Sequence, residues 1–182
     1  MAPSELQLVA NAVPERRAEF IGGRWCAHRA LEKLGLAAET IMPGQFGAPT
    51  WPARASGSIT HESGLCAAAV APRACLRHIG IDCLNTHRDT DLTQLTHLFS
   101  TAADQFPTSL RTASERALVC FCAKEAVVKA ISLCASRYLD LREIRVLVDS
   151  NSFLANVTGI PVEIRGRWEW SDPFILAVAY AA

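Results

Sequence analysis

The chain has 182 residues, of which half are apolar and a fifth are charged, and its formal net charge is zero. This is the composition of an ordinary globular protein, which argues against a disordered chain and against a fibrous one. The even charge balance gives no sign of a polyanion such as nucleic acid as partner. The length suits one compact unit or two small lobes that share a core.

The seven cysteines are odd in number, form no Cys-x-x-Cys pair, and several lie in apolar runs. We therefore expect reduced thiols in a cytoplasmic protein, and the spacing of Cys and His does not fit a standard zinc site. The N-terminus lacks the pattern of a signal peptide, and no uninterrupted run of about 18 apolar residues predicts a membrane span.

The first part of the chain is predicted to be one helical segment over residues 4–35. Ser4 is the expected N-cap, and Gly35 is the expected stop. Gly22 and Gly23 in the middle of the segment indicate either a bend or a close approach of another backbone.

A loop and three short strands are expected next. Residues 41–57 are rich in proline and glycine and predict a loop. Two strands over 58–61 and 65–70, joined by a turn at Glu62-Ser63-Gly64, form the clearest hairpin pattern in the chain. A third strand over 79–82 is expected to end at Asp82.

The second half contains the strongest helix pattern, over residues 112–136, with Ser114 as expected N-cap. A short helix and a loop are expected before it, over 91–111. After it the pattern changes to an antiparallel meander of four strands, over 144–148, 153–157, 162–170 and 174–180. The order of elements predicts an α+β protein in which two helix-plus-sheet halves pack face to face.

Two acidic positions attract interest. Asp82 at a strand end is either a turn former or helix cap, or a metal ligand. Glu125 and Lys129 share one helix face with Leu118 and Cys122, so the pair is either an ordinary surface ion pair or a partly buried one. A partly buried pair would suit a polyphosphate bound through Mg²⁺, with the lysine as a point charge on phosphate.

Two groups of cationic residues leave a similar choice open. His61, beside Thr60 at a strand end, is either structural or a donor to phosphate. Arg16 and Arg24 are eight residues apart, which is about two helical turns, and form either a solvated basic face or an anion site. The sequence contains no P-loop, dinucleotide-binding glycine pattern or nucleophile elbow.

Taken in chain order, several segments resemble the Sfp-type 4′-phosphopantetheinyl transferases, especially the bacterial branch that serves siderophore and polyketide synthesis and includes component D of enterobactin synthetase. The segments are RRAEFIGGRWCAHRALEKLG, PTWPARASGSITH, IGIDCL, FCAKEAVVKA and RGRWEW. The resemblance implies two similar α/β lobes with coenzyme A in the cleft between them. The expected lobes are residues 1–83, for the nucleotide end, and 84–182, for the metal and the catalytic helix, in one compact and monomeric unit.

The resemblance also implies a function and a set of roles. The enzyme would transfer the phosphopantetheine arm of coenzyme A to a serine of an apo acyl, peptidyl or aryl carrier protein and release 3′,5′-ADP. Mg²⁺ would be held by Asp82, Glu125 and the backbone carbonyl of Cys83, and Glu125, or a water that it holds, would take the serine proton. The implied coenzyme A contacts are Lys129 on the diphosphate, Leu139 along the pantetheine path or the adjoining wall, and Arg16, Arg24, Thr60 and His61 around the nucleotide and its 3′-phosphate.

The chain departs from that family in three places. Leu84 stands where many relatives have a further metal-binding acid, so weaker binding of Mg²⁺ is expected. The loop Pro43-Gly44-Gln45-Phe46 lacks the Lys or Arg that relatives often carry there. The chain also starts late and is expected to lack the first strand of the N-terminal lobe, which would uncover a sheet edge. These departures leave open a degenerate homologue that binds coenzyme A or a carrier protein without catalysis.

Overall fold

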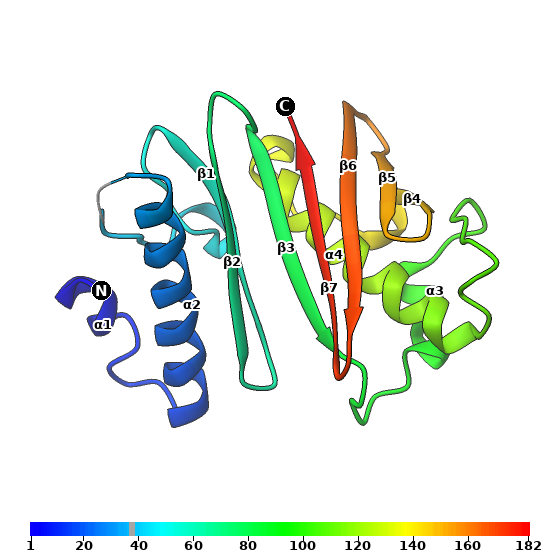
Figure 1. The fold of residues 1–182 in the computed structure, drawn as a ribbon, viewed down its shortest axis with the longest axis horizontal. Coiled ribbons are helices and arrows are strands. Elements are labelled where there is room, and N and C mark those ends of the chain that lie inside the picture. Colours follow the sequence, from blue (N-terminus) through cyan, green and yellow to red (C-terminus); the bar gives the residue numbers. More distant parts are fainter. Residues whose placement is uncertain (37–38) are drawn as a thin grey trace.

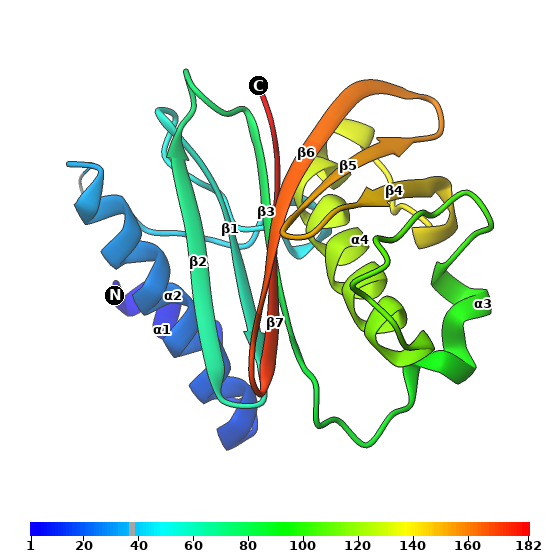
Figure 2. The same ribbon diagram turned by 45° about the vertical axis from the view of Figure 1, so that its right-hand side comes forward.

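The fold consists of two helix-on-sheet lobes, and Figures 1 and 2 show their order across the molecule. The computed structural model describes residues 1–36 and 39–182. In the first lobe α2 (Pro14–Lys33) packs on a hairpin of β1 (Ala55–Glu62) and β2 (Leu65–Pro72). In the second, α4 (Ala113–Ala135) packs on a five-stranded antiparallel sheet. The strands of that sheet, in spatial order, are β3 (His78–Asn85), β7 (Phe174–Ala181), β6 (Ile160–Ser171), β5 (Ser152–Val157) and β4 (Ile144–Val148).

The predicted α+β class, the hairpin, the long helix over 112–136 and the four-stranded meander are therefore confirmed. The expected short helix before α4 is α3 (Thr96–Phe99). The expected loop over 41–57 ends earlier than predicted, because β1 already begins at Ala55 and pairs there with Pro72. Short 3₁₀ turns lie at Gln45–Gly47, Leu92–Leu95 and Leu141–Glu143.

The prediction of one helical segment over 4–35 was wrong. The structure has α1 (Pro3–Gln7) and α2, separated by residues 8–13, and Pro14 is the first residue of α2. Proline lacks an N–H group and is favoured at the first helical position, so it begins a helix here and does not continue one. Ser4 lies inside α1, whose N-cap is Ala2. The fully buried Glu5 carboxylate holds α1 in place by accepting hydrogen bonds from the backbone N–H of Ile41 and from His28 on α2.

Both long helices end or begin on recognisable caps. Gly35, with φ of +68°, follows the end of α2, and the N–H of Leu36 donates to the carbonyl of Leu31, as in a Schellman motif. The predicted stop at Gly35 is thus confirmed. The predicted cap of α4 at Ser114 was wrong, because the N-cap is Thr112, whose hydroxyl accepts from the N–H of Glu115 while Glu115 accepts from the N–H of Thr112.

Asp82 lies inside β3 and not at its end, as was expected. The strand continues to Asn85 because Cys83, Leu84 and Asn85 stay paired with β7. This removes the interpretation of Asp82 as a turn former or a helix cap. The lobe boundary that the sequence suggested, between residues 83 and 84, falls within this strand.

The two lobes meet where β1 lies beside β3, although these strands belong to separate sheets. The main core lies between α4 and the five-stranded sheet, and a smaller one lies under α2. Within the residues described, no helix has the length and apolar character needed to cross a bilayer.

Candidate functional site

The candidate site is centred on Asp82, where β3 faces both β1 and α4. The Oδ1 atom of Asp82 accepts from Lys129 Nζ at 2.6 Å and from the Thr60 hydroxyl at 3.2 Å. Lys129 Nζ also donates to Thr60 Oγ1 at 3.1 Å. Three elements from both lobes therefore contribute one side chain each to a single hydrogen-bonded cluster.

A glycine makes this cluster possible. A Cβ atom at Gly80 would lie 2.0 Å from the carbonyl oxygen of Ala126 and 2.5 Å from the backbone N of Ala130. The backbone of α4 thus rests directly on β3, two residues before Asp82. This close packing lets the half-buried Lys129 of α4 reach the Asp82 carboxylate.

Glu125 lies one helical turn before Lys129 and is half-buried. Burial raises the pKa of its carboxyl, the nearby Asp82 carboxylate raises it further, and Lys129 partly offsets both. Among the residues that the structure describes, Glu125 has no hydrogen-bond or ion-pair partner. As the sequence suggested, Leu118 and Cys122 on the same face are buried, so the pair of Glu125 and Lys129 lies at the edge of the interior.

The backbone of Cys83 points toward the same place. Its N–H donates to Thr60 Oγ1 at 3.2 Å, on the edge of β3 that does not pair with β7. Because the N–H and C=O of one strand residue point to the same side, the Cys83 carbonyl also faces this open edge. Burial raises the pKa of the Cys83 thiol to about 11, so the thiol itself stays protonated at neutral pH.

A cation at this site would have few side-chain ligands. In the described part of the chain no three His, Cys, Asp or Glu side chains come together as a metal-binding group. Leu84, where a further acid could have stood, is buried in the main core at 2% exposure. Asp82, Glu125 and one carbonyl therefore offer only part of an octahedral shell, and waters and substrate oxygens would have to complete it.

The residues that the sequence analysis expected around the nucleotide lie in two different places in the structure. Arg16 Nη1 lies 2.9 Å from His61 Nε2, and Glu19 contacts both at 3.4 Å, so these three side chains form one exposed cluster between α2 and β1. Thr60 lies on the opposite face of β1, because side chains alternate along a strand. The structure therefore joins Thr60 to Asp82 and Lys129, and joins His61 to Arg16.

Arg24 has a different environment from Arg16. It is 7% exposed, its Nε donates to the Ile41 carbonyl at 2.9 Å, and its guanidinium lies over the ring of Phe20 at 4.6 Å. Burial lowers the pKa of Arg24, the nearby Arg16 lowers it as well, and Glu5 opposes the shift. Arg24 thus has a structural partner already, while remaining close to Arg16.

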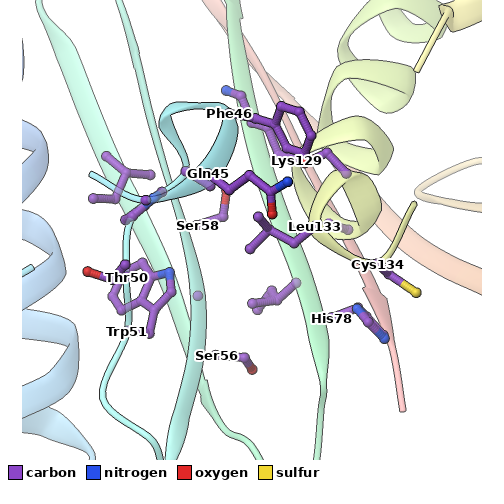
Figure 3. Close-up of a pocket in the computed structure, with 18 of the residues that line it drawn as sticks. Gln45, Phe46, Thr50, Trp51, Ser56, Ser58, His78, Lys129, Leu133 and Cys134 are labelled. Atoms are coloured by element: carbon purple, nitrogen blue, oxygen red, sulfur yellow. The ribbon is translucent and has the colours of Figure 1, made fainter. Parts of the chain in front are cut away.

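A cavity of about 740 Å³ extends from Lys129 between the two lobes (Figure 3). The loop over 44–51, the start of β1, the start of β3 and the end of α4 form its walls. Ser56, Ser58 and Thr60 alternate along β1 and are all buried, which places a row of hydroxyls along the lobe interface. The indole Nε1 of Trp51 is buried in the wall and has no hydrogen-bond partner among the described residues.

Aromatic rings from both lobes cover one side of the cavity. Phe46, in the loop after α2, contacts Tyr138, which follows α4, with ring centroids 4.9 Å apart. Leu133 also lines the cavity, whereas Leu139 packs on the main core as a half-buried side chain next to Tyr138. The sequence reasoning missed Ser56, Ser58, Phe46 and Tyr138, although the alternation of hydroxyls before Thr60 was a usable signal for the first two.

A second missed feature is Lys124, the residue before Glu125. It is fully buried, and its Nζ lies 2.8 Å from both Asp104 Oδ2 and the Phe99 carbonyl. Asp104 also accepts from the N–H of Val146 at 3.0 Å. This buried ion pair fixes α4 to the loop after α3 and to β4, on the side of the helix away from Asp82.

Comparison with known proteins matches two family models to this chain. Residues 4–71 match the 4′-phosphopantetheinyl transferase N-terminal domain, and residues 78–179 match the 4′-phosphopantetheinyl transferase superfamily. The chain is similar to the 4′-phosphopantetheinyl transferase Npt of Nocardia iowensis, at 35% identity over 98% of this chain and 89% of that protein. It is also similar to the 4′-phosphopantetheinyl transferase PptT of Mycobacterium tuberculosis, at 32% identity over 96% of this chain and 83% of that protein. The 4′-phosphopantetheinyl transferase Svp of Streptomyces mobaraensis is 48% identical over 44% of this chain and 32% of that protein.

Proposed function

This chain belongs to the 4′-phosphopantetheinyl transferase superfamily, and from that premise we propose that it moves the phosphopantetheine arm of coenzyme A onto a serine of an apo carrier protein, with the chemistry centred on Asp82, Glu125 and Lys129. The single observation that supports this assignment most is the cluster of Asp82, Lys129 and Thr60. It joins both lobes beside a cavity of about 740 Å³, which Lys129 also lines.

We propose Mg²⁺ as the cofactor, held by Asp82, Glu125 and the Cys83 carbonyl. The residues fit a dication because burial and the nearby Asp82 carboxylate disfavour the charged form of Glu125, and Lys129 offsets only part of this effect. Bound there, the ion would neutralise charge that develops on the diphosphate oxygens.

The protein groups around the proposed diphosphate have separate roles. Lys129 would move from Asp82 to the phosphate oxygens as a point charge, and the Thr60 hydroxyl would orient the same group. Glu125, whose pKa is raised by burial, is suited to accept the proton of the carrier serine. The serine Oγ forms a bond to the β-phosphorus, the bond from this phosphorus to the bridging oxygen breaks, and 3′,5′-ADP leaves.

The rest of coenzyme A would extend in two directions from this centre. The exposed cluster of Arg16 and His61 lies on the α2 side and suits the nucleotide and its 3′-phosphate, with Arg24 near it. The cavity suits the pantetheine arm, whose amides could pair with the Trp51 N–H and the hydroxyls of Ser56 and Ser58. As carriers we propose those of siderophore, nonribosomal peptide or polyketide synthesis, a choice supported by the resemblance of the quoted motifs.

The test is transfer to a panel of apo acyl, peptidyl and aryl carrier proteins, followed by intact mass. At least one carrier should gain the phosphopantetheine mass with Mg²⁺ and not after chelation, and Glu125→Gln should remove the gain. If all carriers stay apo while a known transferase converts them, the proposed activity is wrong. Binding of coenzyme A without transfer would then favour the degenerate homologue, which the buried Leu84 keeps as second candidate.

The proposed position of the pantetheine arm in the cavity can be tested separately, by labelling of cysteine thiols. Cys134 lines the cavity, whereas the other exposed thiol, Cys75, does not. Bound coenzyme A should therefore slow maleimide labelling of Cys134, mapped by peptide mass, and leave Cys75 reactive as an internal control. Trp51→Phe, which removes only the indole N–H donor and some ring area, should raise the KM for coenzyme A several-fold. Equal labelling of both thiols would place the arm elsewhere.

A further inference from the structure

The end of the cavity away from Glu125 carries positive charge. Arg73, directly after β2, and Arg77 and His78, at the start of β3, line it, and we call these three residues the distal cationic corner. Both arginines are exposed, and in the described residues neither takes part in an ion pair. Burial lowers the pKa of His78, a hydrogen bond with the backbone of Ala130 opposes this shift, and the nearby Arg73 and Arg77 lower the pKa further. A corner with two exposed arginines that form no ion pair is suited to a negatively charged ligand.

The distance from the proposed reaction centre to this corner matches the length of the pantetheine arm. Asp82 follows His78 by four residues on β3, which is roughly 13 Å at the usual rise of a strand. The arm has about thirteen chain atoms from its phosphate oxygen to its sulfur, equal to about four residues, and so spans roughly 14 Å when extended. If the diphosphate lies at Asp82 and Lys129, as the proposed function requires, the sulfur reaches the level of His78.

We propose that the distal cationic corner is a subsite for the terminal carboxylate of an acyl group carried on the coenzyme A sulfur. The substrate class is therefore extended to dicarboxylic acyl thioesters of coenzyme A, in preference to neutral acyl thioesters of the same length. The arginine guanidinium matches a carboxylate in plane and can bind both of its oxygens. His78 and Cys134 lie at the same end of the cavity and would border the thioester (Figure 3).

With such a donor, the same bonds would form and break as with coenzyme A itself. The serine oxygen forms its bond to the β-phosphorus, 3′,5′-ADP leaves with the bridging oxygen, and the thioester is not touched. The carrier protein would be loaded with the arm and its acyl group in one step. This inference depends on the proposed function only for the direction of the arm in the cavity.

The experiment compares three donors: coenzyme A, succinyl-coenzyme A and the neutral pentanoyl-coenzyme A. Transfer to one apo carrier is followed by intact mass for the wild type, for Arg73→Gln/Arg77→Gln, and for Arg54→Gln, an exposed arginine outside the cavity. We expect the ratio of kcat/KM for succinyl to pentanoyl donors to fall about fivefold in the double variant, the size expected for an exposed charge pair. Transfer from unmodified coenzyme A and the behaviour of Arg54→Gln should not change.

Two outcomes would overturn the inference while leaving the proposed function intact. One is an unchanged donor ratio in the double variant. The other is an equal loss for all three donors, which would mean that the arginines bind coenzyme A itself or the carrier protein. A wild type that does not transfer from unmodified coenzyme A would instead contradict the proposed function.

Discussion

Gly80 and Ala126 are in backbone contact: a Cβ atom on Gly80 would lie 2.0 Å from the Ala126 carbonyl oxygen. Strand β3 carries Asp82 and helix α4 carries Glu125 and Lys129, so this contact sets the distance between the two acids. Close packing therefore explains the glycine at position 80, two residues before Asp82, because any larger residue there would push β3 and α4 apart.

Gly80→Ala should lower both stability and activity. The added methyl group meets backbone atoms that cannot rotate away, so we expect a loss of about 1–3 kcal/mol in the free energy of unfolding. The Lys129–Asp82 hydrogen bond of 2.6 Å should lengthen, and kcat should fall even at temperatures where the variant is fully folded. Thermal unfolding and transfer assays measure the two effects.

Gly159→Ala is the control for that variant. Gly159 lies in the turn between β5 and β6 with φ of +78° and has open space around a Cβ atom. Its substitution costs backbone strain of about 1–3 kcal/mol without moving α4. Loss of kcat in Gly159→Ala to the same degree as in Gly80→Ala would show that general destabilisation, and not the helix position, explains the result.

Glu125→Gln should make the metal-free protein more stable while it removes transfer. The pKa of Glu125 is raised in the folded state above the ordinary value of 4.5, mainly by burial and then by Asp82. A raised pKa favours the folded state below the unfolded pKa, and this contribution is lost as the pH rises through the folded pKa. At neutral pH the ionised Glu125 is therefore a cost, which the neutral glutamine avoids.

The measurement is a thermal unfolding series from pH 4 to pH 8 in chelator, on the wild type and Glu125→Gln. The difference in Tm should favour the variant at pH 7 and shrink toward the acidic end. Asp140 gives a contrast, because its pKa is lowered to about 2 by Arg142, so Asp140→Asn should lower Tm at neutral pH. A Glu125→Gln variant that is less stable than wild type at pH 7 would mean that the carboxylate has a partner in solution.

The elements with strong local patterns could be predicted from the sequence, as α4, the hairpin and the meander show. Two errors came from signals that were present but weighted wrongly. Pro14 marked the start of α2, and the spacing from Thr112 to Glu115 fits a capping box, whereas Ser114 is followed three residues later by Ala117.

Other features depend on contacts between distant parts of the chain. Lys124 and Lys129 are alike in sequence, yet Lys124 is fully buried against Asp104, 20 residues earlier, and Lys129 is half-buried against Asp82, 47 residues earlier. No local sequence pattern indicates that Lys124, and not Lys129, is the fully buried lysine. The cavity has the same origin, because Ser56 and Ser58 line it only where β1 meets β3.

Arg16→Gln should weaken binding of coenzyme A more than binding of dephospho-coenzyme A. Arg16 is exposed and next to His61, so its substitution removes a charge without disturbing packing, unlike substitution of the buried Arg24. We expect a loss of about five- to tenfold for coenzyme A, the range of a hydrogen bond to a charged group at a partly exposed site. Calorimetric titration with both ligands measures it.

Arg17→Gln is the matched control, because Arg17 is the exposed neighbour of Arg16 and has no ion pair among the described residues. Its effect on either ligand should stay below twofold. Equal losses of both ligands in Arg16→Gln would remove the assignment of this arginine to the 3′-phosphate.

Leu84→Glu tests whether a further acid on β3 can join the proposed Mg²⁺ site. Leu84 is 2% exposed and lies on the same face of β3 as Asp82, two residues away, within the core that α4 covers. A glutamate there buries a third carboxylate beside two others, so without Mg²⁺ we expect a loss of about 2–4 kcal/mol in the free energy of unfolding. With Mg²⁺ and coenzyme A the three carboxylates can share the ion, which should restore part of this stability and lower the Mg²⁺ concentration for half-maximal rate.

Leu84→Gln separates the charge from the loss of apolar packing. Both variants replace the same core side chain with a polar one of similar length, but only the glutamate can coordinate Mg²⁺ strongly. Thermal unfolding with and without Mg²⁺ should show recovery in Leu84→Glu and none in Leu84→Gln. Equal responses of the two variants to Mg²⁺ would mean that residue 84 faces the core alone, and that Asp82, Glu125 and the Cys83 carbonyl form the site with substrate oxygens and water.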